Sequence, residues 1–324
     1  MANSRAVSSS RVIARHLVVT PASGGQTSPV AAAPRAVKVR APAKVNLSLR
    51  VVGRREDGYH LLESLIVPVT LYDDLVLLRR SRGDIVCRVH DAPEVPAGPE
   101  NLVVRAAQAV FEELGCRRGL EIDLYKRIPA GAGLGGGSSD AAAVLRGLPP
   151  MLGRRINRRR LLEMAAELGA DVPFFVGGTP ALVRGIGERL SPISGFPRLA
   201  LVIAVPKARV ETRWAFAHAV PRLTSEKRGN SRAMRSPLAP AQIVAGLHND
   251  LEAGVSAEVE DVRRLGLELR RFGALGTVMS GSGSAVVGVF ESLRRARDVA
   301  RRFSSPDVAW AAYVLRRSPT PIWF

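Results

Sequence analysis

The sequence predicts an α+β protein with two lobes, and three observations lead to this prediction. Its 324 residues are 46% hydrophobic and 23% charged, which is a globular composition long enough for about two domains. In the first half, the expected strands precede the expected helices and do not alternate with them. In the second half, the expected order helix, strand, strand, helix, strand is typical of an antiparallel ferredoxin-like sandwich. We therefore expect an N-terminal mixed α/β lobe over residues 36–185 and a C-terminal ferredoxin-like α+β sandwich over residues 186–324.

Residues 1–35 are expected to form a disordered extension. They are rich in Ser, Ala, Gly and Arg, and no acidic residue precedes Glu56. Such a composition cannot bury enough apolar surface to fold alone. Arg and Ser without acidic residues also resemble an organelle transit segment. We favour a bacterial extension or an early start codon, and hence a cytoplasmic bacterial protein.

The first ordered element should be a strand over residues 37–51, because apolar and polar side chains alternate along its second half. Apolar runs near residues 61–71 and 75–79 suggest further strands. A helix should follow, with Asn101 as its N-cap and Gly115 at its end. The lobe then continues with a strand over 120–128, a helix over 138–148, and a helix capped near Asn157 and closed by Gly169.

The second part of the chain is expected to consist of short strands and helices. The strands should lie near residues 181–185, 199–205, 275–279, 285–290 and 308–316. The helices should lie near residues 211–219, 256–272 and 292–303. Residues 227–240 are polar and are expected to form a loop.

Charge and cysteine content exclude several classes of function. The formal net charge is +18, but it is spread along the chain, and we interpret the densest cluster, at residues 154–160, as a solvated helix face. We therefore expect no nucleic-acid partner, and a basic nucleic-acid-binding protein is the non-enzymatic alternative. No apolar run approaches the roughly 18 residues that a membrane span requires, so no membrane partner is expected. Cys87 and Cys116 form no C-x-x-C pair, which fits a reducing compartment and argues against a structural zinc site.

A glycine-rich stretch between a strand and a helix is the strongest functional signal. Its glycines allow the backbone to approach a ligand closely and to adopt positive φ. The helix that follows presents free N–H groups and a partial positive charge, which suit a phosphate. The residues expected to bind the nucleotide are Pro129, Ala130, Gly131, Ala132, Gly133, Leu134, Gly135, Gly136, Gly137, Ser138 and Ser139.

Two common phosphate motifs fit this stretch poorly. A P-loop needs a Lys followed by Ser or Thr after its last glycine, whereas Gly137 is followed by two serines. The dinucleotide fingerprint G-x-G-x-x-G is present, but it should be followed about 20 residues later by an acidic residue for the ribose. No Asp or Glu occurs between Asp140 and Glu163. A dinucleotide-binding fold is therefore disfavoured.

Further motifs give a resemblance to a known family. The stretch at residues 129–139 resembles the ATP-binding loop of the GHMP kinases, which include galactokinase, homoserine kinase, mevalonate kinase and phosphomevalonate kinase. The resemblance covers roughly residues 37–316 and implies the two-lobed GHMP kinase fold, with ATP and Mg²⁺ as cofactors. The other motifs that carry it are residues 41–47 (APAKVNL), 53–60 (GRREDGYH), 169–175 (GADVPFF), 248–252 (HNDLE) and 279–283 (MSGSG).

The resemblance narrows to family members that phosphorylate the 2-hydroxyl of cytidine diphosphate methylerythritol, so this small molecule is the expected partner. The nearest alternative is another GHMP kinase activity, on mevalonate or homoserine. Residues 58–60 (GYH) discriminate between the two, because those substrates carry no base to stack. Both a monomer and a homodimer are compatible with the sequence.

The resemblance also implies the catalytic residues. Asp171 matches the family's catalytic Asp and is the candidate base that takes the hydroxyl proton. Lys44 matches the catalytic Lys, whose ammonium would orient the hydroxyl and offset charge on the transferred phosphoryl group. Asn46 follows on the same strand face and should hydrogen-bond the polyol. Taken without the resemblance, an Asp after a helix-ending glycine is often a turn residue, and a strand Lys is often simply exposed.

In the resembled enzymes a Tyr and a His recognise the cytosine, and this pair matches Tyr59 and His60. Tyr59 would stack on the base and His60 would make polar contacts with its edge. Thr212 and Phe216 complete the expected substrate site, with Phe216 better aligned than Trp214 as the second stacking aromatic.

The metal ligands are unknown from the sequence. ATP chemistry implies Mg²⁺, yet no carboxylate cluster identifies its ligands, and Ser138 and Ser139 are candidates. Asp140 stands where the family often has Asn. An acidic residue in the first helical turn would repel phosphate unless it is turned away or lies near the metal.

Overall fold

The computed structural model describes residues 34–116, 118–219 and 239–324, which form an eight-stranded and a four-stranded sheet with helices packed on both. The expected disordered extension over 1–35 and the polar loop over 227–240 fall almost entirely outside these ranges. Within the described ranges, no helix is both long enough and apolar enough to cross a lipid bilayer.

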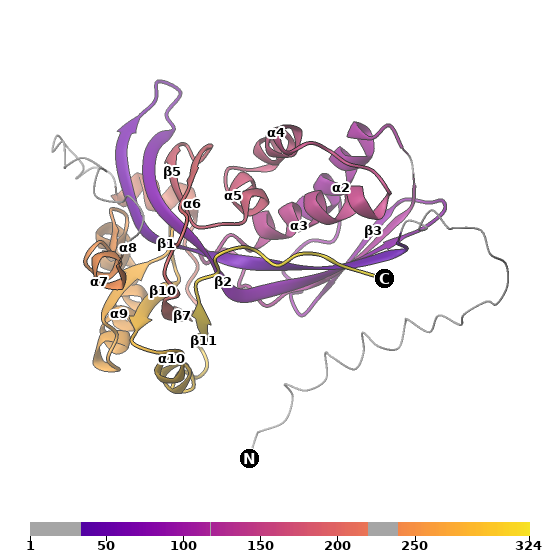
Figure 1. Cartoon of the computed structure of the whole chain (residues 1–324). Helices are drawn as coiled ribbons and strands as arrows, with labels where there is room; N and C mark the ends of the chain where they lie inside the picture. Colours follow the sequence, from indigo (N-terminus) through magenta and orange to yellow (C-terminus); the bar gives the residue numbers. More distant parts are fainter. Residues whose placement is uncertain (1–33, 117, 220–238) are drawn as a thin grey trace, which may run out of the picture. The chain divides into compact units, whose positions relative to one another are not determined.

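The larger sheet is built on a long hairpin of β1 (Ala36–Arg54) and β2 (His60–Arg79), drawn as the indigo ribbon in Figure 1. All strand pairs of this sheet are antiparallel except β1–β8 and β3–β4. The other strands are β3 (Ile85–His90), β4 (Leu120–Tyr125), β5 (Ala181–Gly185), β6 (Arg189–Pro192), β8 (His248–Asn249) and β12 (Ile322–Trp323). The main order is β12-β1-β2-β4-β3, with β5 beside β2, β6 beside β5, and β8 beside β1.

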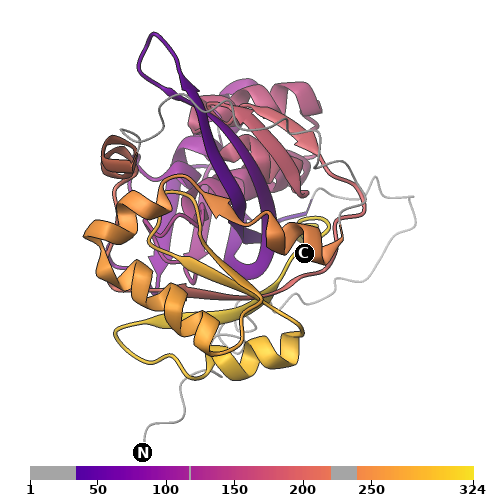
Figure 2. The same ribbon diagram turned by 90° about the vertical axis from the view of Figure 1, so that its left-hand side faces the viewer.

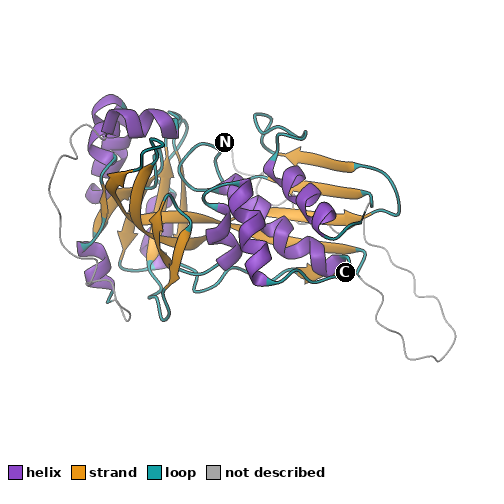
Figure 3. Cartoon of the chain, turned by 90° about the horizontal axis from the view of Figure 1, so that it is seen from above, coloured by secondary structure: helices purple, strands orange, loops and turns teal. Residues whose placement is uncertain are grey.

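Four helices cover one face of this sheet, as Figures 1 and 3 show. They are α2 (Leu102–Glu113), α3 (Gly136–Met151), α4 (Arg158–Leu168) and α5 (Val172–Gly177). Alternate residues of β1, such as Val37 and Val39, are buried in the core that these helices complete. Gly147 lets α3 approach β1 closely, since an added side-chain carbon would lie 2.8 Å from Val39. This packing fixes α3, and with it the glycine-rich stretch at its N-terminus.

The smaller sheet confirms the ferredoxin-like expectation. Its strands are β7 (Ala200–Val205), β9 (Gly276–Met279), β10 (Val286–Phe290) and β11 (Val308–Tyr313). They run antiparallel in the order β11-β7-β10-β9, which is the arrangement of a split βαβ sandwich. The helices α9 (Glu260–Arg271) and α10 (Leu293–Ala300) pack on this sheet, and Figure 2 views the lobe with its helices in front.

The helix caps expected from the sequence are confirmed, whereas several boundaries differ. The side chains of Asn101 and Asn157 accept N–H bonds of 3.0 and 2.9 Å at the starts of α2 and α4. The runs at 61–71 and 75–79 form one strand, β2, because its residues pair continuously with β1. The helix expected over 256–272 is two helices, α8 (Glu252–Glu258) and α9, separated by the non-helical backbone of Val259. The strand β3 and the short helix α5 were not expected.

The expected lobe boundary near residue 185 falls in the turn between β5 and β6, so it would divide a hairpin. We place the division after Pro192 instead. The large sheet also receives β8 and β12 from the C-terminal part of the chain. The division of residues 36–185 from 186–324 is therefore too simple, because strands distant in sequence complete the first sheet.

Candidate active site

A cleft of about 1230 Å³ lies where the glycine-rich stretch, the β1–β2 hairpin and α6 (Thr212–Ala219) meet. It brings together side chains that the sequence separates by up to about 240 residues. The expected site residues that line it are Lys44, Asn46, Tyr59, His60, Pro129, Ala130, Gly131, Ala132, Gly133, Gly135, Gly136, Gly137, Ser138, Asp171, Thr212 and Phe216.

Leu134 and Ser139 are the two expected site residues that do not line the cleft. Leu134 is buried, and its carbonyl oxygen accepts a 2.9 Å hydrogen bond from the backbone N–H of Lys44. Ser139 is buried as well, and its hydroxyl donates to the carbonyl oxygen of Pro42 at 2.7 Å. Both residues therefore join the glycine-rich stretch to the strand that carries Lys44.

The glycine-rich stretch needs its glycines for two separate reasons. Gly131, Gly133 and Gly135 all have φ between +70° and +75°, where other residues are strained. A side-chain carbon added at Gly133 would lie 2.2 Å from the carbonyl oxygen of Ser280, and one at Gly135 would lie 3.0 Å from Lys44. The helix α3 starts at Gly136, two residues earlier than expected, and its first residues line the cleft, so the positive end of the helix dipole lies at the cleft. The arrangement suits a phosphate chain.

Lys44 and Asp171 face each other across this part of the cleft. The Nζ atom of Lys44 lies 3.6 Å from Oδ2 of Asp171 and donates a 2.5 Å hydrogen bond to Oδ1 of Asn46. The Lys44 side chain is 6% exposed, whereas that of Asp171 is 38% exposed. A buried ammonium therefore lies beside a carboxylate that substrate can reach.

The short helix α5 leaves the Asp171 carboxylate available. Asp171 occupies the N-cap position of α5, but its side chain makes no capping hydrogen bond. The next residues, from Val172 to Phe175, are buried in the core and fix the helix beneath the cleft. Apolar packing thus holds the backbone of Asp171 while its carboxylate faces the cleft.

A loop from the smaller sheet, residues 280–283, lies against both Lys44 and the glycine-rich stretch. The Ser280 hydroxyl accepts from the backbone N–H of Asn46 at 3.2 Å and donates to the carbonyl oxygen of Gly133 at 3.1 Å. Asn249 holds the loop from behind, since its side-chain amide donates 2.7 Å bonds to the carbonyls of Met279 and Gly281. Two of the sequence motifs, HNDLE and MSGSG, therefore meet in one supporting structure that sequence reasoning left without a role.

A buried cluster beneath the glycine-rich stretch accounts for Asp140. The ammonium of Lys126 bonds Asp73 and lies 2.8 Å from Oδ2 of Asp140, and all three side chains are buried. Burial raises the pKa of Asp140, with Asp73 adding to the effect and Lys126 opposing it. Asp73 also accepts hydrogen bonds from the backbone N–H groups of Arg127 and Ile128. Asp140 borders the cleft, but its side chain is buried and bonded to the Lys126 ammonium, which offsets its charge beside a bound phosphate.

The far end of the cleft is aromatic. The rings of His60 and Phe216 are stacked, with centroids 5.0 Å apart and planes at 18°. Tyr59 beside them is 62% exposed. Trp214 stacks on His218 and does not line the cleft, so Phe216 is the aromatic that the structure brings to this site. Burial lowers the pKa of His60 below 6.5, and the charge of Arg54 adds to this effect, so the ring is neutral at pH 7.

The opposite wall of the cleft, near the start of α2, was missed by sequence reasoning. It consists of Glu94, Val95, Pro96, Glu100, Asn101 and Leu102. Asn101 caps α2 and also donates from its amide to the carbonyl oxygen of Pro96 at 2.6 Å, which holds this loop in place. The capping signal was visible in the sequence, but nothing local indicated that the cap borders a ligand site.

The chain was compared with protein families, curated proteins and solved structures. The family described as GHMP kinases N terminal domain matches residues 101–179, and GHMP kinases C terminal matches residues 237–308. The 4-diphosphocytidyl-2-C-methyl-D-erythritol kinase of Syntrophotalea carbinolica is 43% identical over 275 residues, which cover 85% of this chain and 96% of that protein. The chain belongs to the GHMP kinase family, and within it to the 4-diphosphocytidyl-2-C-methyl-D-erythritol kinases.

Other relatives agree with this membership. The 4-diphosphocytidyl-2-C-methyl-D-erythritol kinase of Geobacter metallireducens is 41% identical, covering 84% of this GHMP kinase and 95% of that protein. A crystal structure of 4-(cytidine 5'-diphospho)-2C-methyl-D-erythritol kinase matches with a TM-score of 0.72 and 37% identity, covering 86% and 98% of the two chains. Homoserine kinase from Cytophaga hutchinsonii reaches a TM-score of 0.71 at 21% identity, covering 93% and 100%, and this likeness shows the fold alone.

The residues of this GHMP kinase are compatible with Mg²⁺ held mainly by phosphate. Among the described residues, no group of three His, Cys, Asp or Glu side chains is placed to bind a metal. Mg²⁺ usually keeps several waters and binds nucleotide phosphates with only one or two protein ligands. Of the two serines expected as candidates, only Ser138 lines the cleft, because Ser139 is bonded to Pro42. Ser138 is thus the side chain of the pair that could take part.

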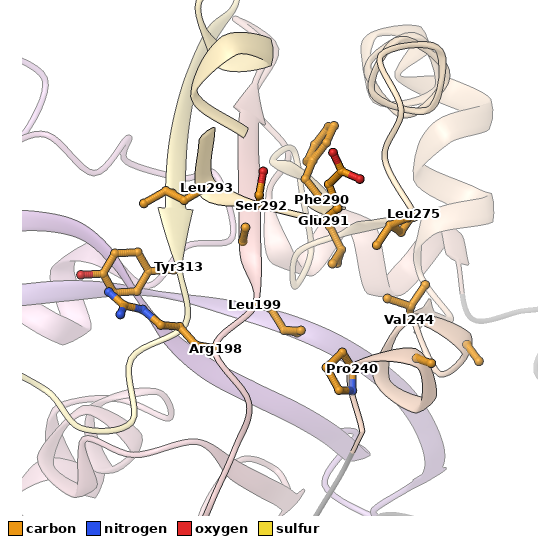
Figure 4. Close-up of a pocket in the computed structure, with 14 residues that line it drawn as sticks. Arg198, Leu199, Pro240, Val244, Leu275, Phe290, Glu291, Ser292, Leu293 and Tyr313 are labelled. Atoms are coloured by element: carbon orange, nitrogen blue, oxygen red, sulfur yellow. The ribbon is translucent and has the colours of Figure 1, made fainter. Parts of the chain in front are cut away.

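A second cavity, of about 810 Å³, lies in the C-terminal lobe of the GHMP kinase (Figure 4). It is bordered by α7 (Pro240–Ala245) and the ends of β7, β10 and β11. Its walls are mostly apolar, and at one edge the Arg198 guanidinium lies 3.7 Å from the centre of the Tyr313 ring. None of the expected site residues reaches this cavity.

Proposed function

We propose that this GHMP kinase transfers the γ-phosphoryl group of ATP to the 2-hydroxyl of 4-diphosphocytidyl-2-C-methyl-D-erythritol, a step of the non-mevalonate route to isoprenoid precursors. One observation carries the proposal. A single cleft contains a phosphate-binding helix start, the Lys44–Asp171 pair and an aromatic end at Tyr59 and Phe216. Relatives of that name at 43% and 41% identity support this choice of substrate.

Asp171 acts in this proposal as the base that accepts the proton of the 2-hydroxyl. Its partly exposed carboxylate can be reached from the cleft, and the Lys44 ammonium lies 3.6 Å from it. Phosphoryl transfer requires little covalent help from protein, so positioning and charge compensation provide most of the rate. Lys44 supplies that charge, because its ammonium is buried and already oriented before substrate binds.

The two ends of the cleft take the two nucleotides. The triphosphate of ATP would follow the glycine-rich stretch, which directs its adenosine toward the wall at residues 94–102. The cytosine would stack against Tyr59 and Phe216, with the neutral His60 as both donor and acceptor for the base edge. The hydroxyls of Thr212 and Ser282, 3.0 Å apart, also line the cleft and would suit the diphosphate of the substrate.

Mg²⁺ is proposed as the metal of the reaction, with Ser138 as the protein group that would hold it. When bound, it would neutralise charge on the phosphate oxygens of ATP. We also propose that the enzyme works in the bacterial cytoplasm, which is consistent with its bacterial relatives and with two cysteines that are both free.

A coupled ADP-release assay on a panel of polyols tests the proposed function. The panel contains 4-diphosphocytidyl-2-C-methyl-D-erythritol, the same polyol without the cytidine diphosphate group, mevalonate and homoserine. We expect turnover only with the cytidyl substrate. Preferential turnover of mevalonate or homoserine would overturn the substrate assignment. Salt-dependent binding to arbitrary DNA without any ATP turnover would instead favour a nucleic-acid-binding protein.

A further inference from the structure

A chain of hydrogen bonds runs from Lys44 along the wall of the cleft to Asn46 and Ser64, and all three residues line the cleft. Nζ of Lys44 donates to Oδ1 of Asn46 at 2.5 Å, and Nδ2 of Asn46 donates to the hydroxyl of Ser64 at 2.8 Å. The Ser64 hydroxyl then donates to the backbone carbonyl oxygen of Ser48. All three side chains of this chain are buried. Ser64 lies on β2 and was not among the expected site residues.

The last bond determines the direction of the others. A carbonyl oxygen can only accept, so the single proton of the Ser64 hydroxyl is used by Ser48. Toward Asn46, the hydroxyl can therefore only accept, which requires the NH₂ group of the amide on that side. The carbonyl oxygen of Asn46 must then face the Lys44 ammonium. The Lys44 ammonium can only donate and therefore requires the same orientation, so the two ends of the chain together hold the Asn46 amide in one orientation.

We propose that Ser64 is a positioning residue for phosphoryl transfer, and that it acts on Lys44 by holding the Asn46 amide in the orientation and place that Lys44 requires. The inference deepens the proposed function and rests on it. It also changes the role expected for Asn46. The Oδ1 atom of Asn46 is bonded to Lys44, so its first task is to hold the lysine and not the polyol.

The fixed amide leaves Lys44 with a defined free donor. An ammonium has three protons, of which one points to Asn46 and a second toward Asp171 at 3.6 Å. The third is available for the transferred phosphoryl group. A lysine side chain without partners is flexible and would lose conformational entropy in the transition state. The hydrogen bond that Lys44 donates to Asn46 restricts the side chain before the reaction, so this entropy cost is smaller.

The strand geometry shows why Ser64 can reach this position. The pairing of β1 with β2 shifts its register between Asn46 and Ser48, so that Asn46 pairs with Ile66 while Ser48 pairs with Leu65. Such bulges re-aim side chains and are common next to active sites. Beside the bulge at Leu47, the Ser64 hydroxyl donates to the Ser48 carbonyl oxygen, and the Ser48 hydroxyl accepts from the backbone N–H of Leu65 at 3.2 Å.

The variants Ser64→Thr and Ser64→Val test the proposal, because Thr and Val differ only by a hydroxyl in place of a methyl group. We expect kcat of the Val variant to be about 10-fold below that of the Thr variant, the effect of one buried hydrogen bond acting in the transition state. The KM values for ATP and for the cytidyl substrate should differ by less than about 2-fold between the two variants. In an Asn46→Ala background the ratio of kcat values should fall to about 1, because Ser64 then has no amide to orient.

Equal kcat values for the two variants would overturn the proposal, as would a ratio that persists in the Asn46→Ala background. A second measurement needs no substrate. Labelling of Lys44 with an amine-reactive reagent should be at least about 3-fold faster in the Val variant than in the Thr variant, and equal rates would again overturn the proposal. If the parent enzyme turned over no member of the polyol panel, the proposed function would fail, while the labelling comparison would still decide the role of Ser64.

Discussion

The proposed phosphoryl-transfer end of the cleft is built mainly from buried groups that already have partners, whereas the proposed base-binding end presents an exposed tyrosine beside two half-buried rings. Lys44, Asn46 and Ser280 are each engaged in hydrogen bonds within the protein. Tyr59 is 62% exposed, and the His60 and Phe216 rings contact each other. At the first end, hydrogen bonds within the protein hold the groups proposed to act in phosphoryl transfer before any ligand binds. At the second end, the bound cytosine would itself complete the aromatic stack. Substitutions at the first end should therefore affect kcat, and substitutions at the second should affect KM.

The largest expected effect comes from replacing Asp171, the proposed general base. Asp171→Asn should lower kcat by at least about 100-fold, because the amide cannot accept the hydroxyl proton. The melting temperature should change little, since the Asp171 side chain makes no capping bond and is partly exposed. The ADP-release assay and thermal unfolding measure the two quantities, with Asp298→Asn on the surface of α10 as the control. Near-normal turnover would remove Asp171 from the mechanism.

The next effect tests how tightly the loop at residues 280–283 supports Lys44. A side-chain carbon at Gly281 would lie 3.2 Å from Nζ of Lys44 and 3.4 Å from Oδ1 of Asn46. Gly281→Ala should lower kcat roughly 30-fold by displacing the ammonium. Gly115→Ala is a matched control, because Gly115 has φ +56° against +59° for Gly281 but has open space around it. Both variants should lose about 1 kcal/mol of stability to backbone strain, and only Gly281→Ala should lose activity. Equal kcat losses would show that strain, and not contact with Lys44, is responsible.

A smaller effect, on KM alone, is expected at the base-binding end. Tyr59→Ala should raise KM for the cytidyl substrate roughly 10-fold, within the range for loss of one base stack, with kcat changed by less than about 3-fold. The KM for ATP should stay constant and serves as the internal control. An unaltered substrate KM with a changed kcat would contradict the stacking role of Tyr59. It would also contradict the expectation that substitutions at this end of the cleft affect KM and not kcat.

The smallest expected effect is a pH dependence of substrate binding. The pKa of His60 is lowered, so the ring is neutral at pH 7 and gains its proton only as the pH falls below about 6.5. Protonation removes the acceptor nitrogen and adds a charge beside Arg54. KM for the cytidyl substrate should therefore be flat above about pH 7 and rise roughly 3-fold by about pH 5.5. His60→Gln cannot be protonated in this range, and the same rise in that variant would exclude His60 as its cause.

The sequence was sufficient for the fold class and for the parts of the site that have a local signal. The cap at Asn101, the glycines at 131–137 and the motif around Asp171 each depend on contacts or conformations within a few residues. The ferredoxin-like order could be read from alternating elements, and the four-stranded sheet confirms it. Local signals thus located the glycine-rich stretch and the helix caps, whereas Lys44, Asp171, Tyr59 and His60 were expected from the resemblance to the GHMP kinases.

The contacts that hold these segments together could not be read locally. Ser64 looks like any polar residue of a strand, and its role depends on a bulge at Leu47 that sequence periodicity does not show. Asn249 is separated by 30 residues from the carbonyl of Met279 that it holds. The orientation of Asp140 on α3 depends on Asp73 of β2 and on Lys126, which directly follows β4. Each of these roles depends on contacts between residues that are distant in the sequence. A single sequence contains no periodicity or motif that indicates such contacts.

The hairpin of β1 and β2 carries the two ends of the cleft on one continuous piece of sheet. Lys44 lies midway along β1, whereas Tyr59 lies in the connection between the strands, just before the pairing of Arg54 with His60. The separation between the base contact and the reacting hydroxyl is therefore set by covalent geometry and strand pairing. A cytidyl polyol with one phosphate fewer could still place its base on Tyr59, but its hydroxyl would fall short of Asp171. The enzyme would then discriminate among nucleotide conjugates by their length, independently of the chemistry at either end.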